Sequence, residues 1–194
     1  MAKRSQNDHW AALAKKQGYP ARSVFKLEEI LQKYPLVKSG DKVLDLGAAP
    51  GGFSLYLARK YQCDVVSCDL KKLEISHPNI LEIQGDFTQE AVLERIQSCG
   101  PFSLVVSDAA PSTTGDRLTD CARSLALVQQ AWAIAQKQLS EGGHFMAKIF
   151  EHGDEREFMA QLGQYFHQVK AVRPKAVRSE SMEFYIVALQ YKRK

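Results

Sequence analysis

Four charged residues stand where a folded protein rarely buries charge, and together they could activate a weak nucleophile. Lys148 ends the apolar stretch GGHFMAKIF, and Asp108 ends SLVVSD. Glu183 opens the apolar stretch EFYIVALQY, and Lys26 lies in the helical pattern RSVFKLEEILQKY. Burying an ammonium costs on the order of several kcal/mol unless it is paired or deprotonated. Lys148 could act as a base, or as a fixed positive charge beside a reacting group. The alternatives are a lysine that reaches water at the strand end and an ion-pair cluster without chemistry.

Alternating strands and helices must position these residues, because chain order alone scatters them. Apolar runs and helical spacing predict strands in 41–47, 64–70, 79–87, 102–111, 144–150, 168–174 and 182–191, and helices in 22–34, 53–61, 89–97, 118–139 and 156–166. This order predicts an α/β fold with a mostly parallel sheet, an antiparallel last strand and helices on both faces. We expect one domain over residues 1–194, with 1–40 as a basic helical extension and 41–194 as the α/β core. Parallel strands end at one edge of the sheet, where ligands bind.

The longest predicted helix has an apolar stripe, which consists of Leu118, Cys121, Leu125, Val128, Trp132, Ala135 and Leu139. Its position on this stripe makes Trp132 a core residue rather than a platform for bases. Gly142 and Gly143 are expected to stop the helix before the Lys148 strand begins.

A glycine loop, DLGAAPGGF (45–53), lies between a predicted strand and a predicted helix. Gly47, Gly51 and Gly52 permit a tight turn and close approach of the backbone to a ligand. The spacing is neither GxGxxG nor GxxxxGK[ST], which argues against a dinucleotide oxidoreductase and a P-loop. An ordinary glycine turn is the alternative.

Two aspartates follow the next predicted strands and suit an adenosyl ligand. Asp69 lies about 20 residues beyond the start of the loop, where an acid can bind two ribose hydroxyls, and Asp86 in QGDF could accept from an adenine amino group. A ligand without phosphates and with a cationic sulfonium would tolerate these carboxylates. The pattern therefore favours S-adenosylmethionine, although aspartates also serve in ordinary turns and caps.

Composition sets the protein class. The 194 residues are 45% hydrophobic and 25% charged, the profile of a globular protein. No run of about 18 apolar residues predicts a membrane span, and the N-terminus MAKRSQNDHW has no apolar region typical of a secretory signal. The four cysteines form no CxxC pair and the five histidines no HExxH motif. We therefore expect a cytoplasmic protein with buried thiols and no metal.

Basic residues cluster in three segments, although the net charge is only +4. Residues 1–42 hold nine Lys/Arg against four Asp/Glu, KAVRPKAVR (170–178) holds four basic residues and no acid, and the chain ends KRK. Such clusters favour a polyanion, most simply nucleic acid, but a solvated basic surface explains them equally well. The candidate RNA-binding residues are Lys15, Lys16, Arg22, Arg173, Lys175 and Arg178.

The motifs, taken together, resemble one family. GYPARSVFKLEEI, VLDLGAAPGGFS, VSDAAPSTTG, FMAKIF and SESMEFYIVA occur in the order found in the FtsJ/RrmJ family of ribosomal RNA 2′-O-ribose methyltransferases. The resemblance extends from about residue 8 to residue 191 and includes no extra RNA-binding domain. It implies a Rossmann-like class I methyltransferase fold, S-adenosylmethionine as methyl donor and RNA as substrate.

By this resemblance the family's Lys-Asp-Lys-Glu set corresponds to Lys26, Asp108, Lys148 and Glu183. Its cofactor loop corresponds to Gly47, Pro50, Gly51 and Gly52, and Phe53 stands where many members have Trp. Asp69, Asp86 and Asp108 complete the expected cofactor site. We expect Lys148 to lie closest to the reacting proton and Asp108 to orient it. Lys26 would supply positive charge, and Glu183 would position Lys26 or the ribose.

The expected substrate is a uridine in large-subunit ribosomal RNA, recognised within an assembled subunit by a monomeric enzyme. A hydroxyl acceptor beside two lysines fits RNA, because the 2′-hydroxyl distinguishes RNA from DNA. A tRNA 2′-O-ribose methyltransferase would share every catalytic residue. A non-catalytic RNA-binding assembly factor is a further alternative, although such a module has no need of the four charged residues.

Overall fold

The computed structural model describes residues 2–151, 153, 155–177 and 181–193, with the backbone alone for residues 2–8. The helices are α1 (Ala2–Lys16), α2 (Val24–Lys33), α3 (Gly52–Tyr61), α4 (Glu90–Cys99), α5 (Arg117–Gln138) and α6 (Glu155–Leu162). The strands are β1 (Lys42–Leu46), β2 (Asp64–Asp69), β3 (Ile80–Gln84), β4 (Phe102–Ser107), β5 (Leu139–Phe150), β6 (Phe166–Val172) and β7 (Glu183–Tyr191).

The strands form a seven-stranded sheet in the order β3-β2-β1-β4-β5-β7-β6. Strands β1 to β5 pair in parallel, whereas β7 pairs antiparallel with both β5 and β6. The order reverses between β1 and β4, so the chain leaves β1 toward α3 on one face of the sheet and leaves β4 toward α5 on the other. Ligands bind in the crevice that such a reversal makes at the carboxyl edge. The predicted fold, mostly parallel with an antiparallel last strand, is confirmed.

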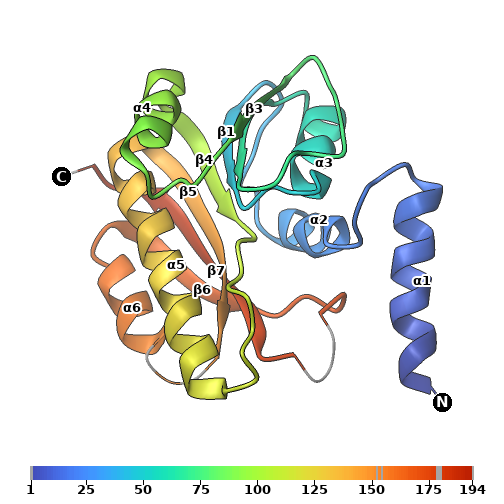
Figure 1. Cartoon of the computed structure of the whole chain (residues 1–194). Helices are drawn as coiled ribbons and strands as arrows, with labels where there is room; N and C mark the ends of the chain where they lie inside the picture. Colours follow the sequence, from blue (N-terminus) through green and yellow to red (C-terminus); the bar gives the residue numbers. More distant parts are fainter. Residues whose placement is uncertain (1, 152, 154, 178–180, 194) are drawn as a thin grey trace.

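Helices cover both faces of the sheet (Figure 1). One apolar cluster joins α4, α5 and α6 to the sheet, and a second joins α2 and α3 to its opposite face. Side chains alternate along β5: Phe145 and Ala147 belong to the first cluster, and Met146 belongs to the second. By the same alternation Lys148 faces the side of α2.

The N-terminal helix α1 lies beyond α2, on the outside of the molecule (Figure 1). It is attached through Trp10, whose ring centroid lies 4.9 Å from that of Phe25, and through Ala14, which is buried. The stripe predicted for α2 is confirmed, because Val24, Leu27, Ile30 and Leu31 are all buried. Trp10 therefore has a packing contact, and α1 is built onto the face that carries Lys26.

Two expectations about helix ends are wrong. Helix α5 ends at Gln138, one residue before the predicted end, but Gly142 and Gly143 do not stop it, because Leu139 is already extended, buried and paired with Phe102 of β4. Both glycines lie inside β5, where the register with β4 shifts. Pairing with the sheet overrides the helical spacing here. Similarly, α6 ends at Leu162 rather than at residue 166, since Phe166 already begins the buried edge strand β6.

The apolar stripe of α5 is confirmed in its middle but not at its start. Trp132 contacts the rings of Phe145, Tyr165, Phe166 and Tyr191 and is therefore a core residue. Leu118 is 62% exposed. Among the described residues, no helix combines the length and apolar character needed to cross a membrane.

Candidate active site

Asp108 and Lys148 form an ion pair at the carboxyl edge of the sheet. Strand β4 ends just before Asp108, and β5, its parallel neighbour, carries Lys148 near its end. The Nζ atom of Lys148 lies 2.8 Å from Oδ1 of Asp108 and also donates to the Asp108 carbonyl oxygen at 2.5 Å. Lys148 is only 8% exposed. Because both contacts lie on Asp108, the ammonium is held in one orientation, and within the described part of the chain one N–H is left for a third partner.

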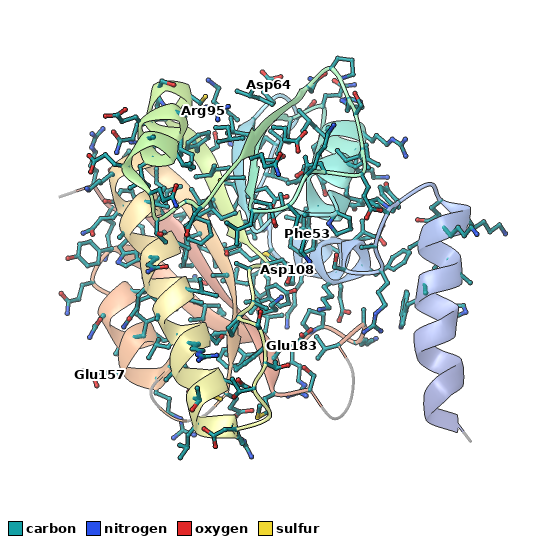
Figure 2. All side chains as sticks on the ribbon, in the orientation of Figure 1. Phe53, Asp64, Arg95, Asp108, Glu157 and Glu183 are labelled. Atoms are coloured by element: carbon teal, nitrogen blue, oxygen red, sulfur yellow. The ribbon has the colours of Figure 1, made fainter. Side chains whose placement is uncertain are left out.

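Lys26 and Glu183 form a second ion pair next to the first. Lys26 comes from α2, which packs over this face of the sheet, and its Nζ donates to Oε1 of Glu183 at the start of β7. Lys26 is 7% exposed. The structure thus brings together all four residues of the predicted set, from three neighbouring strand ends and one covering helix. Figure 2 shows Asp108 and Glu183 at the centre of the molecule.

Tyr185 links the two ion pairs, and the sequence reasoning missed it. It lies directly opposite Lys148 in the β5–β7 register, and its hydroxyl donates to Oδ1 of Asp108 at 2.7 Å. The Nζ atom of Lys26 lies 5.9 Å from the centre of its ring. Tyr185 is fully buried, and burial together with the negative charge of Asp108 raises its pKa well above the usual value. It therefore stays neutral and keeps the proton that it donates to Asp108. Only its position two residues after Glu183 could have signalled this role.

Asp108 keeps its negative charge in this environment. Burial alone raises the pKa of its carboxyl, but the charges of Lys148 and Lys26 and the hydrogen bonds from Lys148 and Tyr185 outweigh burial and lower it. An ionised Asp108 in turn keeps Lys148 paired. The charges therefore support one another, as buried charges must.

A cavity of about 600 Å³ opens beside these ion pairs, in the crevice between the β1 and β4 loops. Four predicted cofactor residues, one from the loop or strand end of each of β1 to β4, line it: Gly47, Asp69, Asp86 and Asp108. Leu70, which is 68% exposed, and Phe87 add apolar surface, and neither was predicted. Three carboxylates and apolar patches suit a flat, hydroxylated and positively charged ligand.

Asp69 and Asp86 are held by backbone groups of their own loops. Asp69 accepts from the amide of Ala49 in the glycine loop at 2.9 Å and from that of Lys71 at 2.8 Å. Asp86 accepts at Oδ1 from the amide and hydroxyl of Thr88, at 2.9 and 2.8 Å. Among the described residues, none bonds the other oxygen of Asp86. Both aspartates serve in turns, as the alternative interpretation held, and both still have acceptor capacity toward the cavity.

The glycine loop needs glycine for contacts within the protein. Gly47 has φ +74°, and a Cβ there would lie 2.6 Å from Cα and N of Ala109, so the β1 and β4 loops touch. Gly51 has φ +111°, and a Cβ there would collide with Ile75. Pro50 and Gly52 shape the same turn, but Pro50, Gly51 and Gly52 do not line the cavity. They act on it by shaping the loop.

Phe53 lies in the apolar cluster of the α2–α3 face, 3% exposed, and is not part of the cavity wall. Its aromatic ring supports the start of α3, which follows the loop.

Asp45 of β1 is fully buried. It accepts a hydrogen bond from the hydroxyl of Ser54 at 2.5 Å, and its other oxygen has no partner among the described residues. Burial and the negative charges of Asp108 and Asp69 raise its pKa to about 7, against the hydrogen bonds from Ser54.

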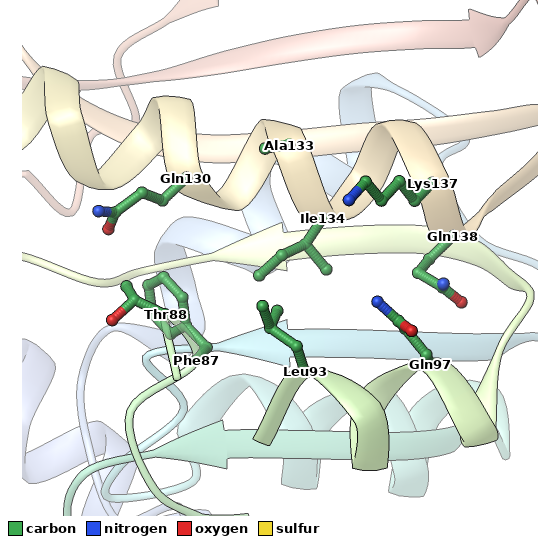
Figure 3. A pocket seen from close by; sticks show the side chains of 9 residues that line it. All are labelled: Phe87, Thr88, Leu93, Gln97, Gln130, Ala133, Ile134, Lys137 and Gln138. Atoms are coloured by element: carbon green, nitrogen blue, oxygen red, sulfur yellow. The ribbon is translucent and has the colours of Figure 1, made fainter. Parts of the chain in front are cut away.

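A second, smaller cavity of about 230 Å³ lies between α4 and α5 (Figure 3). It shares Phe87, Thr88 and Gln130 with the first cavity, but its remaining lining is apolar or uncharged apart from Lys137. No predicted site residue lines it. The candidate site is therefore the carboxylate-lined cavity rather than this one.

Of the predicted RNA-binding residues that the structure describes, Lys15, Lys16 and Lys175 lie by α1 or α2, whereas Arg173 lines a pocket with Arg156 of α6. Lys15 and Lys16 are exposed at the end of α1, and Arg22 lies in the turn that follows. Arg173 and Lys175 are exposed, and the amide of Lys175 donates to Oε2 of Glu29 on α2 at 2.7 Å. Arg178 lies outside the described residues. Within them, no group of three or more His, Cys, Asp or Glu is arranged to hold a metal ion.

Comparison with known proteins identifies the family. The chain belongs to the FtsJ-like methyltransferase family, which matches residues 19–191. Ribosomal RNA large subunit methyltransferase E of Treponema denticola is 41% identical over 194 residues, covering 98% of both proteins. The resemblance inferred from the motifs is confirmed, and the chain is a methyltransferase.

Solved structures show the same fold. A chain from Plasmodium falciparum described as a ribosomal RNA methyltransferase superposes with a TM-score of 0.77 at 23% identity, covering 89% of this chain and 98% of that one. Human methyltransferase-like protein 13, solved in complex with S-adenosylhomocysteine (SAH), gives a TM-score of 0.58 at 11% identity, covering 89% of this chain and 79% of that one.

Proposed function

We propose that this chain transfers the methyl group of S-adenosylmethionine to a ribose 2′-hydroxyl of RNA. The ribose belongs to a uridine in large-subunit ribosomal RNA. One observation carries the proposal: two lysine–carboxylate pairs, linked through Tyr185, share Asp108 with the wall of a carboxylate-lined cavity at the point where strand order reverses. Membership of the FtsJ-like family and the name of the Treponema denticola relative support an RNA substrate.

The cavity fits the methyl donor by charge and shape. When bound, S-adenosylmethionine supplies an electrophilic methyl group on a cationic sulfonium. Asp69 accepts the ribose hydroxyls with its remaining lone pairs, and Asp86 accepts an adenine N–H at its unpaired oxygen. Asp108 adds a carboxylate toward the cationic end, and Gly47, Pro50, Gly51, Gly52 and Phe53 keep the loop close.

Lys148 is the residue closest to the reacting hydroxyl in this proposal. Two of its N–H groups donate to Asp108, so the third is directed at the 2′-oxygen, where negative charge develops. As the 2′-oxygen takes the methyl group, the hydroxyl proton leaves to solvent water and S-adenosylhomocysteine is the leaving group. Asp108 orients Lys148, and Tyr185 holds Asp108. Lys26 adds positive charge to the same site, and Glu183 positions Lys26. Fixed charges of this kind need no reorganisation during the reaction.

RNA lies across the face of α1 and α2 in this proposal. Basic residues contact its phosphates on either side of the ion pairs: Lys15, Lys16, Arg22, Arg173, Lys175 and Arg178. These contacts predict that the affinity for RNA falls steeply with salt concentration. The whole chain works as one domain and as a monomer in the cytoplasm. It recognises the shape of an assembled large subunit.

The test is transfer of labelled methyl groups to large ribosomal subunits, naked ribosomal RNA and tRNA, followed by analysis of the product nucleosides. We expect 2′-O-methyluridine in the RNA of large subunits. Label confined to tRNA would keep the chemistry and replace the substrate. Label on a base rather than a ribose would contradict the proposed reaction.

A further inference from the structure

The segment between β4 and α5 forms one wall of the large cavity. Residues 108–116 connect the two elements, and Ala109, Ala110 and Ser112 line the cavity beside Asp108. Residues 112–116 are exposed, so the segment gains little from burial. Hydrogen bonds must therefore supply much of what fixes its course.

Asp120, in the first turn of α5, supplies such bonds. Asp120 is only 4% exposed. The start of α5 does not need a carboxylate at this position, because another residue is its N-cap. Oδ1 accepts from the amide and the hydroxyl of Thr114, at 2.8 and 2.9 Å, and Oδ2 accepts from the amide of Gly115 at 3.3 Å. The amide of Thr114 contributes most to lowering the pKa of this carboxyl, so the acceptor stays ionised.

The ordinary capping of α5 is done by another residue. Asp116 is the N-cap and accepts from the amide of Thr119 at 2.8 Å. The helix start therefore does not depend on Asp120, whose carboxylate points back to the connecting segment. Asp116 therefore caps the helix, and Asp120 holds the connecting segment.

We propose that Asp120 is a positioning residue for methyl transfer: its carboxylate holds residues 109–115 in the course that forms the cavity wall beside Asp108. The inference rests on the cofactor placement proposed above. It assigns Asp120 no contact with substrate or cofactor. Its removal frees the wall, which weakens cofactor binding more than it slows the chemical step at saturating cofactor.

The test uses the full-length chain and S-adenosylhomocysteine as the probe in calorimetric titrations, with methyl-transfer kinetics and thermal unfolding in parallel. Asp120→Ala is expected to raise the Kd and the cofactor KM by about tenfold or more, because bonds to a charged acceptor are removed, with a smaller change in kcat. Asp120→Asn keeps the acceptor for Thr114 and should restore binding to within about threefold of wild type. Thr114→Val, an exposed change, should raise the Kd by about threefold.

Asp116→Ala is the matched control. It removes a carboxylate from the same helix end and should lower the Tm while leaving the Kd within about twofold of wild type. Equal Kd values for wild type and Asp120→Ala would overturn the inference, as would an Asp116→Ala variant that raises the Kd as much as Asp120→Ala does. If the wild-type chain does not bind S-adenosylhomocysteine, the proposed cofactor site is wrong, and this inference, which rests on that site, is wrong as well.

Discussion

The cofactor side and the substrate side of the proposed active site hold their charges in different ways. On the cofactor side, Asp69 and Asp86 are fixed by backbone amides and a hydroxyl of nearby loops, and their free lone pairs face a cavity. On the substrate side, charged side chains from distant parts of the chain fix one another as buried ion pairs. Among the residues that the structure describes, only Asp108 takes part in both, since it lines the cavity and pairs with Lys148.

The difference shows what each side can do. Carboxylates held by neutral donors keep their full negative charge toward a ligand, which suits recognition of hydroxyls and a cation. Lysines already paired with carboxylates present a fixed positive edge with little net charge, which suits a developing alkoxide. We therefore expect substitutions on the two sides to separate cofactor affinity from the rate of transfer.

The cofactor side should respond through affinity. Asp69→Ala removes the acceptor for the ribose and frees the amides of Ala49 and Lys71. We expect the Kd for S-adenosylhomocysteine to rise about 10- to 100-fold, with kcat largely recovered at saturating donor. Asp64→Ala, at the opposite end of β2, is the control and should bind normally. Unchanged affinity in Asp69→Ala would mean that the ribose is held elsewhere.

Substitution of Tyr185, which links the two ion pairs, should change kcat rather than cofactor affinity. Tyr185→Phe removes one hydrogen bond to Asp108 in a fully buried place, and we expect kcat to fall about tenfold with little change in cofactor Kd. Tyr191→Phe removes a hydroxyl from the same strand, where it donates to Gln136 far along α5, and gives the matched comparison. Equal kcat values for the two variants would deny Tyr185 its role.

Substitutions on the RNA-binding face should change how strongly RNA affinity depends on salt concentration. Lys175→Glu is expected to weaken RNA binding severalfold and to reduce the slope of log K against log salt by about 1 for each phosphate that is no longer neutralised. Lys137→Glu makes the same change of charge on α5, on the opposite face of the sheet, and should leave the slope as it is. A slope that both variants reduce equally would point to overall charge rather than a local interaction.

Asp45 should give a pH dependence of stability opposite to that of Asp108. Its pKa of about 7 in the folded chain exceeds that of an exposed aspartate, so the unfolded chain loses the proton first as pH rises. The free energy of unfolding should therefore fall between about pH 4 and pH 7, by roughly 4 kcal/mol, and level off above that. Asp45→Asn should remove this fall, measured by denaturant titration at several pH values. Parallel curves for both proteins would refute the assignment.

Much of this arrangement could be predicted because it follows from local pattern. Apolar runs indicated the strands, helical spacing indicated the buried face of α2, and strand ends placed Asp108 and Lys148 at one edge. The early start of β5 could not be predicted, because Leu139 fits a helical stripe and only pairing with Phe102 makes it a strand residue. Tyr185 resembles an ordinary core residue and Asp120 a polar helix position, since their partners lie far away or in an irregular segment.

The central claim is that Lys148 acts on the reacting hydroxyl and not on the cofactor. The most direct measurement is single-turnover methyl transfer to large ribosomal subunits by Lys148→Ala, with calorimetric titration of S-adenosylhomocysteine on the same preparation. We predict that transfer falls by about 10³-fold or more while the Kd stays within about threefold of wild type. Transfer that persists within about tenfold, or a loss of transfer fully accounted for by weaker cofactor binding, would contradict the account.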